Sequence, residues 1–187
     1  MLIKLNSKKI FSQVYKCHYK RKLCVVKMMK VEGTFYLKSG QNELKILKRI
    51  KHPRIVALLK SYSFDSKIRT EQFNFVLEYM ENGSLRDILN QYEQKRWKFG
   101  QPDLLALFMD MAVGLKYLHS KGVIHRDLKP ENVLADKLHR LKIADFGVSK
   151  IAGVSAGANN HTQVGTSSYM APEVTSDLPY DKSCDGE

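Results

Sequence analysis

The chain has 187 residues and a net charge of +12, with 43% hydrophobic and 27% charged residues. This composition is typical of a globular protein of one or two compact domains. No run of 18 apolar residues occurs, so we expect no membrane span, and charge interrupts the N-terminus too early for a secretory signal. Cys17, Cys24 and Cys184 show no CxxC spacing or pairing pattern. They favour free thiols in a reducing compartment, which predicts a cytoplasmic or nuclear protein that is not secreted.

The positive charge is concentrated in the first third of the chain. Residues 1–60 hold 16 of the 31 Lys and Arg residues but only two of the 19 acids, Glu32 and Glu43. A nucleic-acid or acidic-surface patch is one interpretation. The lysines are scattered without interleaved aromatic platforms, which favours instead a solvated basic face around a polyanionic ligand. We therefore expect no nucleic-acid partner.

The first third of the chain is predicted to form short strands with one helix between them. Residues 14–31 are rich in β-branched and aromatic residues and break near residues 20–22, which predicts a hairpin. Residues 41–50 carry apolar side chains at helical spacing, and Pro53 follows as a stop. Two further strands are predicted at residues 55–59 and 73–79.

The clearest predicted helix spans residues 102–119. Pro102 suits a first helical turn, and Gly122 is placed to end the helix. Apolar side chains recur at i, i+3 and i+4 and predict one continuous stripe. The stripe comprises Leu104, Leu105, Phe108, Met111, Ala112, Leu115 and Leu118.

The segment from His125 to Asn132 carries the most informative chemistry. Within six residues, Asp127 offers a carboxylate for a substrate hydroxyl, Lys129 a cation for a γ-phosphate, and Asn132 an oxygen ligand for Mg²⁺. A charged turn after a helix is the plain alternative. The triplet Asp145-Phe146-Gly147 follows an apolar run, and the Asp145 carboxylate suits Mg²⁺ that bridges the β- and γ-phosphates.

A third motif, Ala171-Pro172-Glu173, begins 26 residues after Asp145. In this order and spacing the three motifs resemble the eukaryotic-type protein kinase family, serine/threonine class, over nearly the whole chain. The resemblance implies an α+β, two-lobed fold, with a small antiparallel-sheet N-lobe (residues 1–80) and an incomplete helical C-lobe (residues 81–187). Asp185 matches the aspartate that opens the family's central large-lobe helix and steadies the catalytic loop, so we expect the chain to stop where that helix starts.

The resemblance also implies ATP and Mg²⁺ as cofactors. Lys27 lies in the segment Cys24-Val25-Val26-Lys27, where the family contacts the α- and β-phosphates, and Glu43 is its implied ion-pair partner. Leu77 occupies the gatekeeper position. The other residues implied to hold the nucleotide are Val14, Val25, Leu134, Asp145, and the backbone of Glu78 and Met80. The apolar residues among them would also suit an ordinary hydrophobic core.

One family feature is altered. The family's glycine-rich loop should fall at residues 7–14, but Ser7, Lys9 and Ser12 stand at its three glycine positions. Glycines let backbone amides approach phosphates closely. Either the loop binds nucleotide more weakly than a glycine-rich one, or the true start of the domain lies elsewhere.

Residues 145–173 correspond to the family's activation segment. Lys129 in the catalytic loop and Thr166 in the docking loop favour Ser/Thr rather than Tyr acceptors. Thr162 lies where the family commonly carries an activating phosphate, and Arg126 is the natural cation to receive it. Ser167 and Ser168 are rival sites.

Three functions are compatible with different features of this sequence. An ATP-dependent protein serine/threonine kinase in signalling explains the intact set Lys27, Glu43, Asp127, Asn132 and Asp145. A catalytically weak or inactive, nucleotide-binding regulatory protein would fit the altered glycine loop and incomplete C-lobe, and a nucleic-acid binder explains only the charge. Without the rest of the C-lobe, the stripe on residues 104–118 would face solvent. We therefore expect protein substrates, a partner that covers this surface, and poor solubility of the isolated chain.

Overall fold

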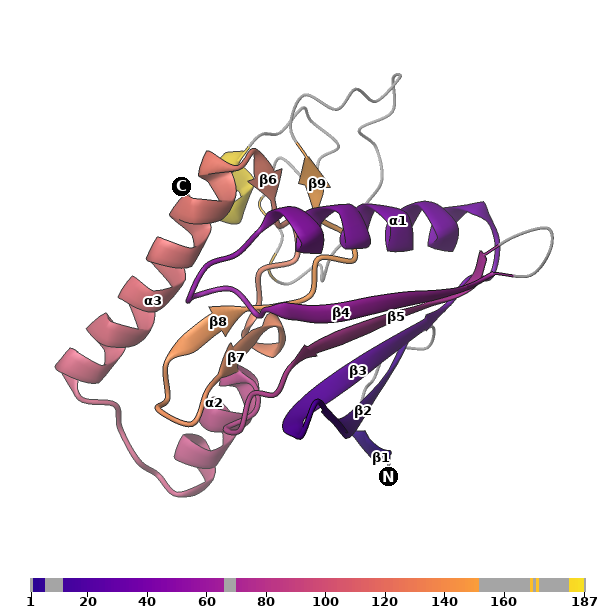
Figure 1. Cartoon of the computed structure of the whole chain (residues 1–187). Coiled ribbons are helices and arrows are strands. Elements are labelled where there is room, and N and C mark those ends of the chain that lie inside the picture. The colour runs from indigo at the N-terminus through magenta and orange to yellow at the C-terminus, as the bar shows by residue number, and fades with distance from the viewer. Residues whose placement is uncertain are drawn as a thin grey trace. The chain divides into compact units, whose positions relative to one another are not determined.

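The structure, a computed structural model, describes residues 2–5, 12–65, 70–151, 169, 171 and 182–186. The chain divides into two compact units (Figure 1). Unit 1 comprises Met1–Lys51 and Val56–Tyr79, and unit 2 comprises His52–Ile55 and Met80–Glu187. Among the described residues, none of the helices combines the length and hydropathy needed to cross a bilayer.

Unit 1 is a five-stranded antiparallel sheet with one helix, α1 (Thr34–Arg49). The sheet order is β1-β2-β3-β5-β4, and α1 runs along β4 and β5 (Figure 1). The strands are β1 (Ile3–Leu5), β2 (Ser12–Tyr19), β3 (Lys22–Lys30), β4 (Leu58–Asp65) and β5 (Thr70–Glu78).

The predicted hairpin is confirmed, because β2 and β3 pair antiparallel around a two-residue turn. Lys20 and Arg21 adopt φ values of 48° and 63°, the left-handed backbone that such a turn requires. The predicted strand at residues 55–59 is only partly correct. Strand β4 begins at Leu58, because Ile55 instead forms an isolated bridge to Ile143 within unit 2.

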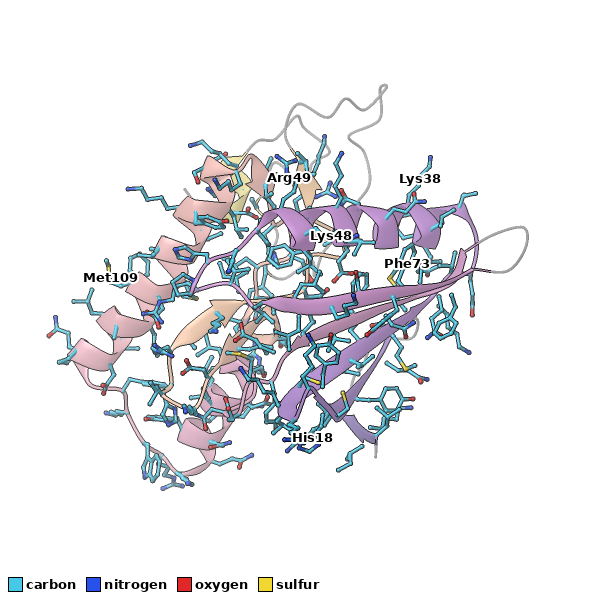
Figure 2. The ribbon with its side chains drawn as sticks, in the orientation of Figure 1. His18, Lys38, Lys48, Arg49, Phe73 and Met109 are labelled. Atoms are coloured by element: carbon cyan, nitrogen blue, oxygen red, sulfur yellow. The ribbon has the colours of Figure 1, made fainter. Side chains whose placement is uncertain are left out.

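Helix α1 starts seven residues before the predicted residue 41. Apolar periodicity did not indicate this first part of the helix, because part of the buried face is not apolar. Its buried positions are Gly40, Glu43, Ile46 and Leu47. A Cβ atom at Gly40 would lie 2.4 Å from both Met29 Cε and Phe73 Cδ2, so the helix packs too closely for a larger residue. In Figure 2, Phe73 lies between α1 and the sheet, whereas the exposed Lys38 points away. A glycine contact of this kind leaves no hydrophobic periodicity to detect.

In its described residues, unit 2 contains two α-helices, short 3₁₀ helices at Pro130–Asn132 and Lys182–Asp185, and short paired strands. Helix α2 (Leu85–Gln94) begins with a capping box between Ser84 and Asp87, and α3 (Gln101–Ser120) confirms the helix predicted at residues 102–119. A core of Leu85, Val133, Ala135 and Leu141 lies between these elements. The strands pair as β6 (Val123–Ile124) with β9 (Lys150–Ile151), and β7 (Val133–Ala135) with β8 (Leu141–Ile143).

The segment His52–Ile55 belongs to unit 2 although unit 1 flanks it on both sides. Arg54 accepts a hydrogen bond from the backbone of Ile143 through its carbonyl and forms a 2.8 Å ion pair with Asp110 on α3. The His52 ring stacks on Tyr117, with centroids 4.6 Å apart. These contacts place the residues that follow α1 against α3 and β8.

Helix α3 is only partly covered by the described residues. Leu118 is fully buried and Met111 packs against the core of unit 2. The N-terminal half of the helix is different, since Leu104, Leu105 and Phe108 are each more than half exposed. Met109, which projects outward in Figure 2, is 50% exposed. The predicted stripe is therefore buried at its C-terminal end and exposed at its N-terminal end.

Candidate active site

Unit 1 places Lys27 and Glu43 in direct contact. The Lys27 Nζ atom lies 2.6 Å from Glu43 Oε1 and 2.9 Å from Oε2. Lys27 projects from β3 and Glu43 from α1, and their side chains are 10% and 1% exposed. A buried charge is tolerated only when an opposite charge and hydrogen bonds compensate it, so each residue depends on the other.

The other candidate nucleotide residues of unit 1 share one face of its sheet. Val14 on β2 lies opposite Lys27 on β3, and Val25 lies opposite Leu77 on β5. Opposed residues, and residues two apart in a strand, point to the same side of a sheet. Val14, Val25, Leu77 and Lys27 therefore line one face, with the lysine beside the apolar side chains. Glu78 ends β5, and its Oε1 accepts a 2.7 Å hydrogen bond from Ala57 N.

Unit 2 brings Asp127, Lys129 and Asn132 together within one short loop. Asp127 Oδ2 accepts a hydrogen bond from Asn132 Nδ2 at 2.7 Å, and Lys129 Nζ lies 2.9 Å from the same oxygen. A single 3₁₀ turn, Pro130–Asn132, reverses the chain so that Asn132 faces back toward Asp127. Asn132 also donates to the Asp127 carbonyl at 2.8 Å and is only 4% exposed. The loop thus holds a carboxylate, an ammonium and an amide in mutual contact.

A distant carboxylate supports the backbone of this loop. Asp185 accepts hydrogen bonds from His125 N at 2.7 Å and from Arg126 N at 2.8 Å. Its Oδ2 also lies 3.0 Å from Nε2 of His119, near the end of α3. Arg126 has φ = 66°, which is costly for a residue other than glycine and persists only where its surroundings hold it. Asp185 supplies that support, in agreement with the steadying role that the sequence implied.

Asp145 follows β8 and is linked to the same loop. The Ala144 N–H donates to the Asn132 carbonyl at 2.8 Å, which ties the exit of β8 to the end of the loop at residues 125–132. Asp145 itself has φ = 68°, a second strained non-glycine residue beside the loop. Phe146 is buried and packs edge-on against His125, with ring centroids 5.3 Å apart.

Sequence reasoning overlooked the structural part played by two histidines. His125 is fully buried, its Nε2 lies 3.0 Å from the Ala144 carbonyl, and its own carbonyl accepts from Ser149 Oγ. His119 lies close to Asp185, with its side chain 3% exposed. The sequence did contain a signal for His119, because this polar side chain lies at the end of the otherwise apolar stripe on α3.

Some of the remaining predicted residues lie within the described part of the chain and others lie outside it. Leu134 lies on β7 and forms an isolated bridge with Ser84, and Met80 is buried. Arg126 Nε donates to the Val148 carbonyl at 2.7 Å. A cavity of about 280 Å³ adjoins the loop at residues 125–132. Its lining includes Arg126, Leu128, Tyr169 and Asp185. Predicted residues outside the described part of the chain are Ser7, Lys9, Thr162, Thr166, Ser167, Ser168 and Glu173.

One ion pair fixes the outer side of the loop at residues 125–132. Arg86 Nε, on α2, donates to Glu131 Oε1 at 2.9 Å, and Arg86 also contacts the Tyr169 hydroxyl. Burial alone would raise the pKa of Glu131, but the hydrogen bond from Arg86, a backbone hydrogen bond and the nearby charges of Arg86 and Lys129 together outweigh burial, so the pKa lies below its ordinary value. Glu131 therefore stays ionised and ties the loop to α2.

Comparison with known proteins agrees with this geometry. The family model described as protein kinase domain matches residues 10–186. The chain therefore belongs to the protein kinase family, and the predicted α+β kinase fold is confirmed.

The relatives are serine/threonine kinases of modest identity. The serine/threonine-protein kinase nekl-2 of Caenorhabditis elegans is 33% identical over 153 residues, which cover 79% of this chain and 41% of that protein. The cAMP-dependent protein kinase type 3 of Saccharomyces cerevisiae is 37% identical over 166 residues, 88% of this chain and 37% of that protein. CBL-interacting protein kinase 9 of Oryza sativa subsp. japonica is 39% identical over 143 residues, 75% of this chain and 29% of that protein. The chain thus spans less than half the length of these relatives.

Proposed function

We propose that this protein transfers the γ-phosphoryl group of ATP to serine or threonine hydroxyls of protein substrates, in a signalling role. The observation that carries the proposal is the convergence of Asp127, Lys129 and Asn132, with contacts of 2.7–3.0 Å. Phosphoryl transfer depends mainly on positioning and charge compensation, which this loop is built to supply.

Each loop residue has a distinct proposed part. Asp127 accepts a hydrogen bond from the substrate hydroxyl and receives its proton. Lys129 exchanges its contact with Asp127 for one with the γ-phosphate oxygens, where its charge offsets the charge that develops during transfer. Because Asn132 Nδ2 is directed at Asp127, its Oδ1 remains for a metal ion.

The donor set of unit 2 fits Mg²⁺. Asn132 supplies an amide oxygen and Asp145 a carboxylate, hard oxygen ligands of the type that Mg²⁺ takes in small number alongside water and phosphates. The Ala144-to-Asn132 hydrogen bond couples the two positions. When bound, Mg²⁺ neutralises charge on the β- and γ-phosphates.

The proposed contacts to the rest of the nucleotide come from residues of unit 1, and the family resemblance adds Met80 and Leu134 of unit 2. Lys27, held by Glu43, would contact the α- and β-phosphates. The apolar face of Val14, Val25 and Leu77 suits one surface of adenine, with Leu134 as a further contact and the backbone at Glu78 and Met80 as hydrogen-bonding edge. We expect weak binding, because Ser12 replaces a glycine at the start of β2 and is itself buried.

Acceptor specificity and regulation rest on resemblance. Lys129 and Thr166 favour serine and threonine acceptors, and Thr162 is the proposed activating phosphorylation site. Arg126, at the base of the loop, is its proposed cationic partner. A cytoplasmic or nuclear location is proposed because the three cysteines are free thiols.

A second candidate function is a nucleotide-binding regulatory protein of low catalytic activity. The buried Ser12 in place of a phosphate-approaching glycine favours it. So does the exposed apolar half of α3, which suits a covering protein partner.

The test compares phosphate incorporation into a Ser/Thr peptide library with nucleotide binding by calorimetry, for the wild type, Asp127→Asn and Asp145→Asn. We expect Asp127→Asn to lower transfer by roughly 10²–10⁴-fold with nucleotide affinity retained. Asp145→Asn should weaken Mg²⁺-dependent nucleotide binding. Asp103→Asn, an exposed position on α3, is the matched control and should change neither.

The outcomes separate the two functions. Nucleotide binding by folded wild-type protein without any transfer supports the regulatory function. Transfer that Asp127→Asn leaves unchanged contradicts the proposed mechanism. Absence of binding at millimolar Mg²⁺-ATP contradicts both.

A further inference from the structure

Two cysteines that are seven residues apart in sequence meet across the hairpin of unit 1. Cys17 on β2 lies directly opposite Cys24 on β3, and their Sγ atoms are 3.2 Å apart. Both thiols are reduced, and they pack in a small cluster with Val76, flanked by Tyr19 and Val26. The cysteine spacing gave no indication of this contact.

We propose that Cys17 and Cys24 form a reversible disulfide, which makes this hairpin a site of oxidative modification. This inference is independent of the proposed kinase activity. Directly opposed residues of an antiparallel pair have Cα atoms about 4.5–5.5 Å apart, within the range of about 4.4–6.8 Å that a disulfide spans. The sulfurs need to approach by only about 1 Å to reach a bond length near 2.05 Å, which side-chain rotation can supply.

The two thiols differ in access, and this difference gives them different parts in the reaction. Cys17 is 9% exposed and Cys24 is fully buried. Burial, then the contact with Cys17, raises the pKa of Cys24 to about 11, so it stays a neutral thiol near pH 7. An oxidant therefore reaches Cys17 first, and Cys24 is the resolving thiol beside it.

The chemistry balances with a peroxide as oxidant. The Cys17 thiolate attacks the peroxide O–O bond and becomes a sulfenic acid, and the peroxide leaves as water or alcohol after taking a proton. Cys24 sulfur then attacks the Cys17 sulfur, the S–S bond forms, and the sulfenic oxygen leaves as water with the Cys24 proton. Two electrons pass from the thiols to the peroxide, and a dithiol reductant reverses the step.

Packing alone is the competing explanation, because a buried cysteine often acts as a small apolar side chain. A valine at either position would fill similar space but could not cross-link. Side chains along β2 and β3 alternate between the two faces of the sheet, so a cross-link on one face also restrains residues on the other. The face opposite the cysteines carries Val14 and Lys27, so a cross-link would stiffen the strands that hold them.

The experiment treats the reduced full chain with hydrogen peroxide, blocks remaining thiols with N-ethylmaleimide, and maps tryptic peptides without reduction. We expect residues 17–20 joined to residues 23–27, with a mass 2 Da below the sum of the two thiol peptides and separation by dithiothreitol. Cys184→Ser should keep this product. Cys24→Val should lose it and leave a Cys17 sulfenic acid that dimedone traps.

Comparison with unfolded protein distinguishes a built site from chance proximity in a short loop. We expect the Cys17–Cys24 cross-link to form faster in the native chain than in guanidinium, each rate taken relative to oxidation of Cys184. Complete modification of Cys184 with both hairpin thiols still open to maleimide after denaturation would overturn the proposal. So would cross-linking that is equal or faster in the unfolded chain.

Discussion

The charged groups of the candidate site are assembled in opposite ways in the two units. In unit 1, Lys27 comes from strand β3 and Glu43 from helix α1, and the two residues are 16 positions apart in sequence. In unit 2, Asp127, Lys129 and Asn132 lie within six residues, and one 3₁₀ turn brings them together. The first arrangement depends on long-range packing and the second on local backbone geometry.

The loop of unit 2 that carries Asp127, Lys129 and Asn132 is also held by a residue distant in sequence. Asp185 is about 60 residues from His125 and Arg126 in sequence, yet it accepts hydrogen bonds from both backbones. Local sequence thus brings the catalytic groups together, whereas a remote carboxylate maintains the strained backbone beneath them. Four substitutions test how far the contrast holds.

The largest effect is expected from Asp185→Ala. It removes the acceptor that Asp185 provides to the His125 N–H and the Arg126 N–H, and one partner of His119, at about 1–3 kcal/mol for each lost hydrogen bond. We expect the free energy of unfolding of unit 2 to fall by about 3–6 kcal/mol, with hydrogen exchange accelerated at residues 125–132. Lys116→Ala, an exposed site on α3, is the control. A loop protected as in the wild type would show that it needs no tether.

Glu43→Ala should act on unit 1. It leaves the Lys27 ammonium buried without its carboxylate, which costs about 3–5 kcal/mol when a buried pair is broken. Urea unfolding measures the loss. The double variant Lys27→Met with Glu43→Ala removes both charges and should be less destabilised than the sum of Glu43→Ala and Lys27→Met. Additive losses would indicate that the pair is not coupled in the folded protein.

Gly40→Ala tests the close approach of α1 to the sheet. Alanine normally favours a helix over glycine by about 1 kcal/mol. Here the added Cβ would meet the Phe73 ring at 2.4 Å, so we expect a net destabilisation of about 1–3 kcal/mol from overpacking. Lys38→Ala, on the exposed side of the same helix, should be close to neutral in thermal unfolding. A more stable Gly40→Ala protein would mean that Phe73 and Met29 move aside easily.

The smallest effect concerns Asp136, a carboxylate with only local partners. Burial alone would raise its pKa, but hydrogen bonds from Arg140, and from the backbones of Arg140 and Leu138, outweigh it and hold the pKa below its ordinary value. A carboxyl whose pKa is lowered by folding stabilises the protein above its unfolded pKa, near 3.9, and loses that contribution as the pH falls through the folded value.

Asp136→Asn should therefore cost about 1 kcal/mol at pH 7 and progressively less below pH 4. Urea unfolding across pH 3–7 measures the difference from the wild type, with Asp103→Asn as control. A deficit that persists unchanged at pH 3 would assign the effect to shape rather than charge.

Sequence patterns were sufficient to predict the parts of this protein whose geometry is local. The turn at Lys20–Arg21, the helix Gln101–Ser120 and the loop from Asp127 to Asn132 were all predictable. Hydrophobic periodicity, turn chemistry and short-range motifs act over a few residues, so no distant contact is needed to recognise them.

The contacts between residues far apart in sequence depend on the folded structure. It extended α1 back to Thr34 through the buried Gly40 and Glu43 and placed His52–Ile55 in unit 2. Neither leaves a periodic apolar pattern, because a glycine contact and a buried ion pair depend on register and packing. Register and packing depend on contacts between elements that are far apart in the chain. Local propensity does not encode which of those elements come into contact.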